Sequence, residues 1–270
     1  MSITQILKTL VIIVCLTLAA SLMGQTILVH GAGTCDIGVY CAFGGTKLMD
    51  QLLTIHQTNV GGNGAMISVQ MATVLPEDTA AYWVEISNDQ LGEWMQIGYC
   101  LGICPPSGGP AAFNSNLQFY VEWKDANGNY AIHLLGGAGW TTPHHFRVWQ
   151  YYTSAGCSVA FSIDGYQEPY SPLWGPTCGI NAKATDAIED HYLAVFNKPD
   201  YIVAVFSGME YYDCGWVSWA SSACAIPNVD YSSAYSDGPV AVVANGNTAF
   251  YAYTLQGPIG GSGCGGCRLV

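Results

Sequence analysis

The side chains with the clearest capacity for chemistry are four glutamates in the middle and second half of the chain: Glu85, Glu93, Glu122 and Glu189. Hydrolysis of a glycosidic bond by paired carboxyl groups needs two acids about 5–10 Å apart, and these residues could supply such a pair. No Glu-x-Asp-x-Glu strand is present. The glutamates alone therefore do not identify a catalytic pair or a reaction.

Motifs of several other enzyme classes are missing. The sequence has no Gly-x-Ser-x-Gly, no His-Glu-x-x-His, no phosphate-binding loop and no dinucleotide fingerprint. The only local histidine pair is His144-His145. Because neighbouring residues of a strand point to opposite faces, we expect a loop-edge or cross-strand role for this pair and no shared metal ion. No cofactor is implied.

Two of these glutamates, Glu85 and Glu122, and also Gln96 lie in three short segments that alternate apolar and polar residues, a pattern typical of half-buried strands. The segments are Tyr82–Ile86, Trp94–Cys100 and Leu117–Trp123. Their tryptophans are candidates for the core, and on one concave face they would also form a stacking platform for sugar rings or peptide side chains. The candidate substrate-binding residues are Trp83, Glu85, Trp94, Glu122 and Trp123.

Further strands are predicted throughout the chain, bounded by Gly, Pro, Asn and Asp. They are Met66–Val74, Tyr130–Leu135, His145–Tyr152, Ser158–Ile163, Tyr192–Phe196, Tyr201–Phe206, Val240–Ala244 and Ala249–Leu255. Asp125–Gly128 and Asp164-Gly165 are hairpin-turn signals. So many short strands indicate an all-β, antiparallel sandwich.

One helix is expected ahead of these strands, over Thr46–His56. Thr46 can cap it, and Leu48, Leu52 and Ile55 recur at helical spacing. The expected domain organisation is a signal peptide at 1–24, an extension carrying this helix at 25–64, the sandwich at 65–256 and a Gly/Cys-rich tail at 257–270.

Composition restricts the partners. Charged residues make up 10% of the chain, against roughly 25% in an average soluble domain. Seven Lys and Arg residues and a formal charge of −12 argue against nucleic acid or an anionic membrane as a partner. With few cations, self-repulsion in acid stays modest, which fits an acidic exterior and equally an ordinary acidic secreted protein.

The first residues are typical of an export signal. Lys8 precedes the apolar run Leu10–Ala20, and Ala19-Ala20-Ser21 offers small residues for cleavage. The run is shorter than the ~20 residues of a spanning helix. We therefore expect a secreted, extracellular protein without stable membrane insertion after cleavage.

Cysteine usage agrees with export. Without Cys15 ten cysteines remain, and an even count in an exported chain indicates disulfides. Local pairs such as Cys35–Cys41 and Cys214–Cys224 are plausible, although spacing does not fix connectivity. The alternative is a four-thiolate zinc site from Cys100, Cys104, Cys264 and Cys267.

A resemblance adds to this interpretation. The blocks Trp83–Asp89, Met95–Gly98, Tyr120–Trp123 and Phe161–Gly165 resemble, in order, those of the eqolisins (glutamic peptidases) and of related secreted concanavalin-like proteins of the neprosin type. The resemblance covers about residues 80–195. It implies a concanavalin-like jelly roll whose concave sheet carries a Gln/Glu or Glu/Glu catalytic pair and works in acid.

Carried over to this sequence, the resemblance implies that Gln96 is the catalytic glutamine and that a later Glu is its partner. Glu189 is the candidate, although the Glu-Trp context of the family is missing there. Glu189 would act as general base and then acid, and Gln96 would stabilise the oxyanion. The implied function is a secreted, acid-active glutamic-type endopeptidase with a peptide substrate. The alternative is a non-catalytic module that binds polysaccharide or serves at the cell surface.

Overall fold

The protein is described here from a computed structural model. The described residues are 39–50, 60–74, 78–88, 91–104, 113–139, 142–175, 178, 183–193, 201–212, 215–219, 229–237, 240–245 and 248–254. All of them belong to one compact unit that spans Gly31–Val270. None of them forms a helix of the length and apolar character needed to cross a bilayer. The expected signal peptide and the Gly/Cys-rich tail lie outside the described residues.

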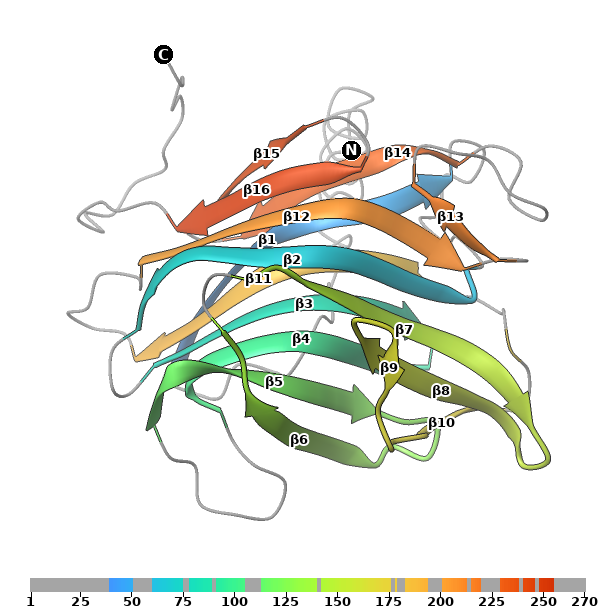
Figure 1. Cartoon of the computed structure of the whole chain (residues 1–270). Coiled ribbons are helices and arrows are strands. Elements are labelled where there is room, and N and C mark those ends of the chain that lie inside the picture. Colours follow the sequence, from blue (N-terminus) through green and yellow to red (C-terminus); the bar gives the residue numbers. More distant parts are fainter. Residues whose placement is uncertain are drawn as a thin grey trace, which may run out of the picture. The chain divides into compact units, whose positions relative to one another are not determined.

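Two antiparallel sheets make up the described structure, as Figure 1 shows. Sheet A has seven strands. Its order is β14 (Val229–Asp237), β1 (Val39–Asp50), β11 (Lys183–Leu193), β3 (Thr79–Asn88), β4 (Glu93–Ile103), β5 (Phe113–Lys124) and β6 (Tyr130–Gly137).

Sheet B has nine strands. The order of its main path is β10 (Leu173–Gly175), β8 (Gly156–Ile163), β7 (His144–Thr153), β2 (Gly62–Thr73), β12 (Tyr201–Tyr212), β16 (Ala249–Thr254) and β15 (Val240–Ala244). Two short strands lie off this path: β13 (Trp216–Ser218) pairs with β12, and β9 (Tyr166–Gln167) pairs with β8. The expected all-β antiparallel sandwich is confirmed.

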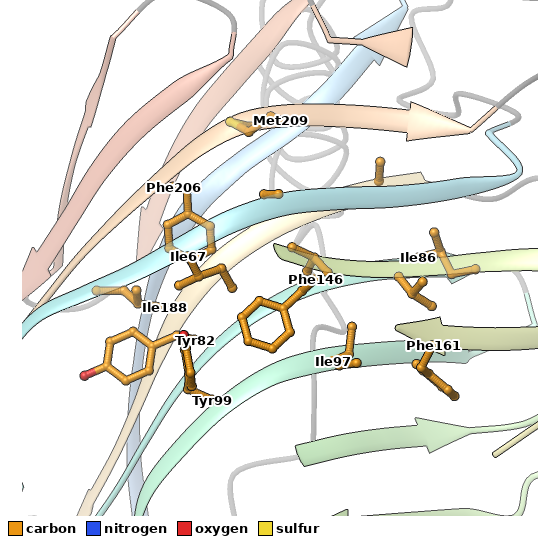
Figure 2. Close-up of a cluster of buried hydrophobic side chains, with 14 of the residues drawn as sticks. Ile67, Tyr82, Ile86, Ile97, Tyr99, Phe146, Phe161, Ile188, Phe206 and Met209 are labelled. Atoms are coloured by element: carbon orange, nitrogen blue, oxygen red, sulfur yellow. The ribbon is translucent and has the colours of Figure 1, made fainter. Parts of the chain in front are cut away.

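The core lies between the sheets and follows from the alternation along each strand. Tyr82, Ile97 and Ile188 enter it from sheet A, and Phe146 and Phe206 enter it from sheet B. Figure 2 shows these side chains interdigitating. Because every second residue of a strand points the same way, the remaining residues of sheet A lie on the face turned away from sheet B. We call this face the outer face.

The expected helix over Thr46–His56 is wrong for the part that the structure describes. Residues up to Asp50 belong to β1, which pairs with β11 on one side and β14 on the other. Leu48 faces its ladder partner Ser232 on β14. Two ladders of backbone hydrogen bonds outweigh the weak helical propensity of this segment. Positions 51–59 lie outside the described residues.

Strands β1, β11 and β14 were not expected from the sequence. For β11, only its last residues fall in the predicted strand Tyr192–Phe196. Strand β1 and the start of β2 lie within 25–64, and they are part of the two sheets. The sandwich therefore includes residues that the sequence assigns to an extension.

Both predicted turns are present. The β5–β6 turn is closed by the Gly128 amide, which donates to the Asp125 carbonyl at 2.8 Å. Asp164 and Gly165, between β8 and β9, both have positive φ, 52° and 83°. That backbone is typical of a two-residue hairpin turn, so the two signals identified real chain reversals.

Two disulfides are described. Cys100 pairs with Cys104 at the end of β4, and Cys157 on β8 pairs with Cys178. The zinc alternative is therefore wrong, because two of its four thiolates are oxidised. The suggested pairs Cys35–Cys41 and Cys214–Cys224 lie outside the described side chains.

A glycine on β4 tests how tightly the strands of sheet A are packed. A Cβ on Gly98 would lie 1.8 Å from the carbonyl oxygen of Tyr82 and 2.8 Å from the Cα of Trp83. Both obstacles are backbone atoms of β3. We expect Gly98→Ala to lower the free energy of unfolding by roughly 2–3 kcal/mol through overpacking, measured by urea denaturation.

Gly139→Ala is the matched control, because nothing lies within 4 Å of the Cβ it would add. Its stability should stay within about 0.5 kcal/mol of the wild type. Equal effects of the two substitutions would contradict the close approach of β3 and β4.

Candidate active site

The candidate site is a row of polar side chains across four neighbouring strands of sheet A. Thr185 on β11 pairs with Glu85 on β3, Glu85 pairs with Gln96 on β4, and Gln96 pairs with Glu122 on β5. Side chains of directly paired residues share a face and lie roughly 5 Å apart at Cβ. We call these four residues the polar row. It places a glutamate on each side of Gln96, on the outer face.

Gln96 is held by strand β5. Its Nε2 donates to Glu122 Oε2 at 2.5 Å and to the Tyr120 hydroxyl at 3.1 Å. These two acceptors fix the orientation of the amide. Its Oε1 is buried, and among the described residues it accepts no hydrogen bond from the protein. Gln96 therefore offers an unused acceptor beside a carboxyl group.

Glu122 is held on both oxygens. Gln96 donates to Oε2, and the Tyr130 hydroxyl at the start of β6 donates to Oε1 at 2.5 Å. Burial and then the charge of Glu122 raise the pKa of Tyr130, so this hydroxyl keeps its proton and remains a donor. The carboxyl group of Glu122 consequently has a defined orientation.

Tyr120 shows that the carboxyl groups of this face converge. Its side chain is buried, and burial raises the pKa of Tyr120 well above its ordinary value. The charges of Glu122, Glu189 and Glu85 raise that pKa further, in this order. All three carboxyl groups therefore act on one hydroxyl, although they come from β5, β11 and β3.

Glu189, the predicted partner of Gln96, lies on the same face but is not in the same row across the strands. Its ladder partner is Ala81, whereas Glu85 is the partner of Gln96. The Trp83 indole donates to Glu189 Oε2 at 3.3 Å. The structure thus gives Gln96 a direct contact with Glu122 and holds Glu189 through Trp83.

The three candidate tryptophans do not share a face. Trp83 and Trp94 lie on the outer face, and Trp94 meets Tyr130 edge-on at 6.0 Å between ring centroids. Trp123 directly follows Glu122 and so points to the opposite side, where its ring lies 6.1 Å from that of Phe161. The expectation that Trp123 lines the same groove is wrong.

The polar row is enclosed. Gln96 is 0% exposed and Glu122 is 8% exposed, and Glu85, Trp83 and Trp94 are buried as well. The exposed member of the group is Tyr130, at 54%. The solvent-open groove expected of a concave catalytic sheet is therefore not present over these side chains.

Glu93, the fourth sequence candidate, does not join the row. It is an odd-numbered residue of β4, as are the core residues Met95 and Ile97, so it points to the core side. It is 3% exposed. Burial and then the charge of Asp125 raise the pKa of Glu93 to about 7.

The histidine pair behaves as its alternation predicts. His144 contacts Asp164 through Nδ1 at 2.5 Å, whereas His145 contacts Glu210 through Nε2 at 2.8 Å. Each has its own acidic partner, so they do not converge on one ion. In the described part of the chain, no group of three or more His, Cys, Asp and Glu side chains is placed to hold a metal.

Sequence reasoning missed Thr185, Tyr120 and Tyr130. The sequence could have indicated Tyr120, because it stands two positions before Glu122 on the same strand and so shares its face. Tyr130 follows the predicted turn, and its contact with Glu122 depends on how β6 is placed beside β5. Thr185 lies on β11, a strand that the sequence did not predict.

Comparisons with known proteins place the fold. Neither a protein-family model nor a curated protein sequence matches the chain. Among solved structures, scytalido-glutamic peptidase with a peptide-based transition-state analogue matches at a TM-score of 0.52 and 13% identity, over 80% of this chain and 100% of that one. SCP-B of the eqolisin family, in a complex with the tripeptide Ala-Ile-His, matches at 0.48 and 14%, with the same coverage. The chain thus has an eqolisin-like, concanavalin-like fold.

The pKa of Glu93 generates a prediction on stability. Because this pKa is raised in the folded state, the contribution of neutral Glu93 to the stability of the fold is full below the ordinary pKa of 4.5. This contribution is lost as the pH rises through about 7. Glu93→Gln removes the charge without changing the shape. At about pH 9 the variant should be more stable than the wild type by about 1–3 kcal/mol, measured by urea denaturation.

At about pH 4 both side chains are uncharged, so the two proteins should have equal stability there. A stability difference that does not change with pH would contradict the assignment.

Proposed function

We propose that this chain is a secreted glutamic-type endopeptidase that acts in acid through Gln96 and a glutamate of the outer face. The observation that carries the proposal is the 2.5 Å contact between Gln96 Nε2 and Glu122 Oε2, in a row where Glu85 flanks Gln96 from the other side. The eqolisin-like fold supports it.

The chemistry follows from these groups. A carboxylate takes a proton from water as the water oxygen attacks the amide carbonyl of the substrate. The carbonyl oxygen becomes an oxyanion, and the Gln96 amide stabilises it as a donor once one Nε2 hydrogen is released from Tyr120. The same carboxyl group then gives its proton to the leaving amine as the C–N bond breaks. We assign the carboxylate role to Glu122, because it contacts Gln96 directly.

Glu189 remains the competing candidate that the sequence suggested. It acts electrostatically on Tyr120 together with Glu122 and Glu85, so it belongs to the same group of acids. Its hydrogen bond from Trp83 indicates a fixed position beside the row. Single substitutions of the three glutamates therefore separate the roles.

Acidic working conditions are supported by two buried acids outside the row. Burial raises the pKa of Glu93 to about 7 and raises that of Asp186 well above its ordinary value. A raised pKa in the folded state favours folding at low pH. The scarcity of Lys and Arg keeps the positive charge small when the carboxylates are neutral.

Secretion is supported by the two described disulfides, since such bonds persist mainly in oxidising compartments. The apolar run Leu10–Ala20 after Lys8 supplies the export signal in this proposal. A peptide is the proposed substrate.

One observation favours the second candidate, a non-catalytic concanavalin-like module that binds polysaccharide or serves at the cell surface. The polar row is almost wholly buried. A row that no substrate reaches would act as a structural hydrogen-bond network joining β4, β5 and β6.

The experiment is cleavage of a denatured protein at about pH 3–4, followed by gel electrophoresis and mass spectrometry. Gln96→Ala and Glu122→Gln should each lower kcat/KM by about 100-fold or more, because each removes a group that acts on the reacting atoms. Glu189→Gln should cost about tenfold or less if Glu122 is the base.

Gln167→Ala on β9 is the control, since its side chain is exposed and belongs to sheet B rather than to the sheet that carries this network, and it should retain full activity. A larger loss in Glu189→Gln than in Glu122→Gln would transfer the base to Glu189. No cleavage at any pH, together with retention on a polysaccharide column, would establish the second candidate.

A further inference from the structure

A second polar cluster lies directly behind the polar row, on the core side of sheet A. Its centre is Asn63 of β2, a side chain of sheet B that reaches across to β3 and β11. Its Nδ2 donates to the carbonyl oxygens of Glu85 at 3.1 Å and Thr185 at 3.0 Å, and to Asp186 Oδ1 at 2.7 Å. Asn63 thus holds the backbone of two members of the row.

The partners of Asn63 fix the orientation of its amide. All three are oxygens, so the group that faces them is the NH₂ and not the carbonyl. Its Oδ1 must then be an acceptor. Both Asn63 and Asp186 are 0% exposed.

Three buried oxygens in this cluster lack a hydrogen-bond partner in the described part of the structure: Asn63 Oδ1, Asp186 Oδ2 and Thr46 Oγ1. Thr46 on β1 is the ladder partner of Asp186. An unsatisfied buried polar atom costs about 1–3 kcal/mol, so the concentration of three of them at one place needs an explanation. An ionised Asp186 would make the deficit worse, because it brings acceptors only.

We propose that Asp186 is a neutral carboxylic acid whose Oδ2–H donates to Asn63 Oδ1, so that one proton locks Asn63 in place and holds the backbone beneath Glu85 and Thr185. A carboxylic acid and an amide can exchange two hydrogen bonds, one in each direction. Asn63 already donates to Oδ1. The proton turns Oδ2 into the missing donor for Asn63 Oδ1.

The surroundings of Asp186 favour the neutral form. Burial raises its pKa well above the ordinary value, and the hydrogen bond from Asn63 offsets this only in part. The titratable side chains that face the same layer from packed strands are Tyr82 on β3 and Tyr211 on β12, both buried. Burial and the Asn63 hydrogen bond are the influences on this pKa, and no charge of a described residue is among them.

The expected pH dependence has a definite sign. Since the folded-state pKa of Asp186 is raised above its unfolded value of 3.8, the stabilisation is full below about pH 4 and is lost as the pH rises. The proton therefore couples the Asn63 contacts to acid. This inference needs no catalysis, so it stands or fails separately from the proposed function.

The test compares Glu93→Gln with Glu93→Gln/Asp186→Asn in urea denaturation from about pH 4 to about pH 9. The Glu93 substitution is present in both because the pKa of this buried acid is also raised, which would add its own pH dependence. Asparagine keeps the shape of Asp186, and it keeps a donor at every pH. We expect the midpoint of Glu93→Gln to fall with rising pH and that of the double variant to stay level.

Infrared spectroscopy of Glu93→Gln gives a second measurement that does not depend on the double variant folding. The C=O stretching band of a protonated carboxylic acid should persist at about pH 7, well above the ordinary range for Asp, and should disappear on unfolding. Absence of that band at neutral pH, or equal pH dependence of the two proteins, would overturn the proposal.

Discussion

The register between β11, β3, β4 and β5 is the constraint on which both polar clusters depend. In an antiparallel ladder the side-chain period is two, and a shift of one residue would move every side chain to the other face. In the observed register Glu85, Gln96 and Glu122 lie side by side on the outer face, while Val84, Ile97 and Val121 enter the core. The tight packing at Gly98 helps to hold this alignment.

The two faces of sheet A are polar in different ways. On the outer face, Gln96, Tyr130 and Tyr120 supply donors or dipoles around several carboxyl groups. On the core face, Asp186 accepts a hydrogen bond from an amide, that of Asn63. The same strand pair β3–β11 carries both arrangements, because consecutive residues such as Thr185 and Asp186 point in opposite directions. The two clusters therefore share the backbone of β3 and β11.

Much of the fold could be predicted from the sequence, because alternation and turn residues are local signals. They located most strands and both turns. They failed for β1, where helical spacing from Thr46 was overridden by pairing with β11 and β14. They also failed for β11. Its acidic residues are typical of a solvent-exposed segment, and only the pairing with β1 and β3 on either side makes it an inner strand.

The candidate site was predictable only in part for a related reason. Strand parity shows that Gln96 shares a face with Trp94, and it could have shown that Trp123 does not share a face with Glu122. Parity says nothing about which distant strand lies alongside. Thr185 stands opposite Glu85 although 100 residues separate them in the sequence, and only the long-range register brings them together. The resemblance led to Glu189, whereas our proposal assigns the role to Glu122 because it contacts Gln96 directly.

The proposed preference for acid and the proposed capacity for hydrolysis would have separate physical origins in this fold. Glu93 and Asp186 point to the core side, and burial raises the pKa of both. They favour the folded state in acid whether or not the outer face is catalytic. Hydrolysis would depend on Gln96 and the outer glutamates, and the burial of this row limits it. A protein of this fold could thus retain its adaptation to acid after losing catalysis, which is why acid stability by itself does not identify a peptidase.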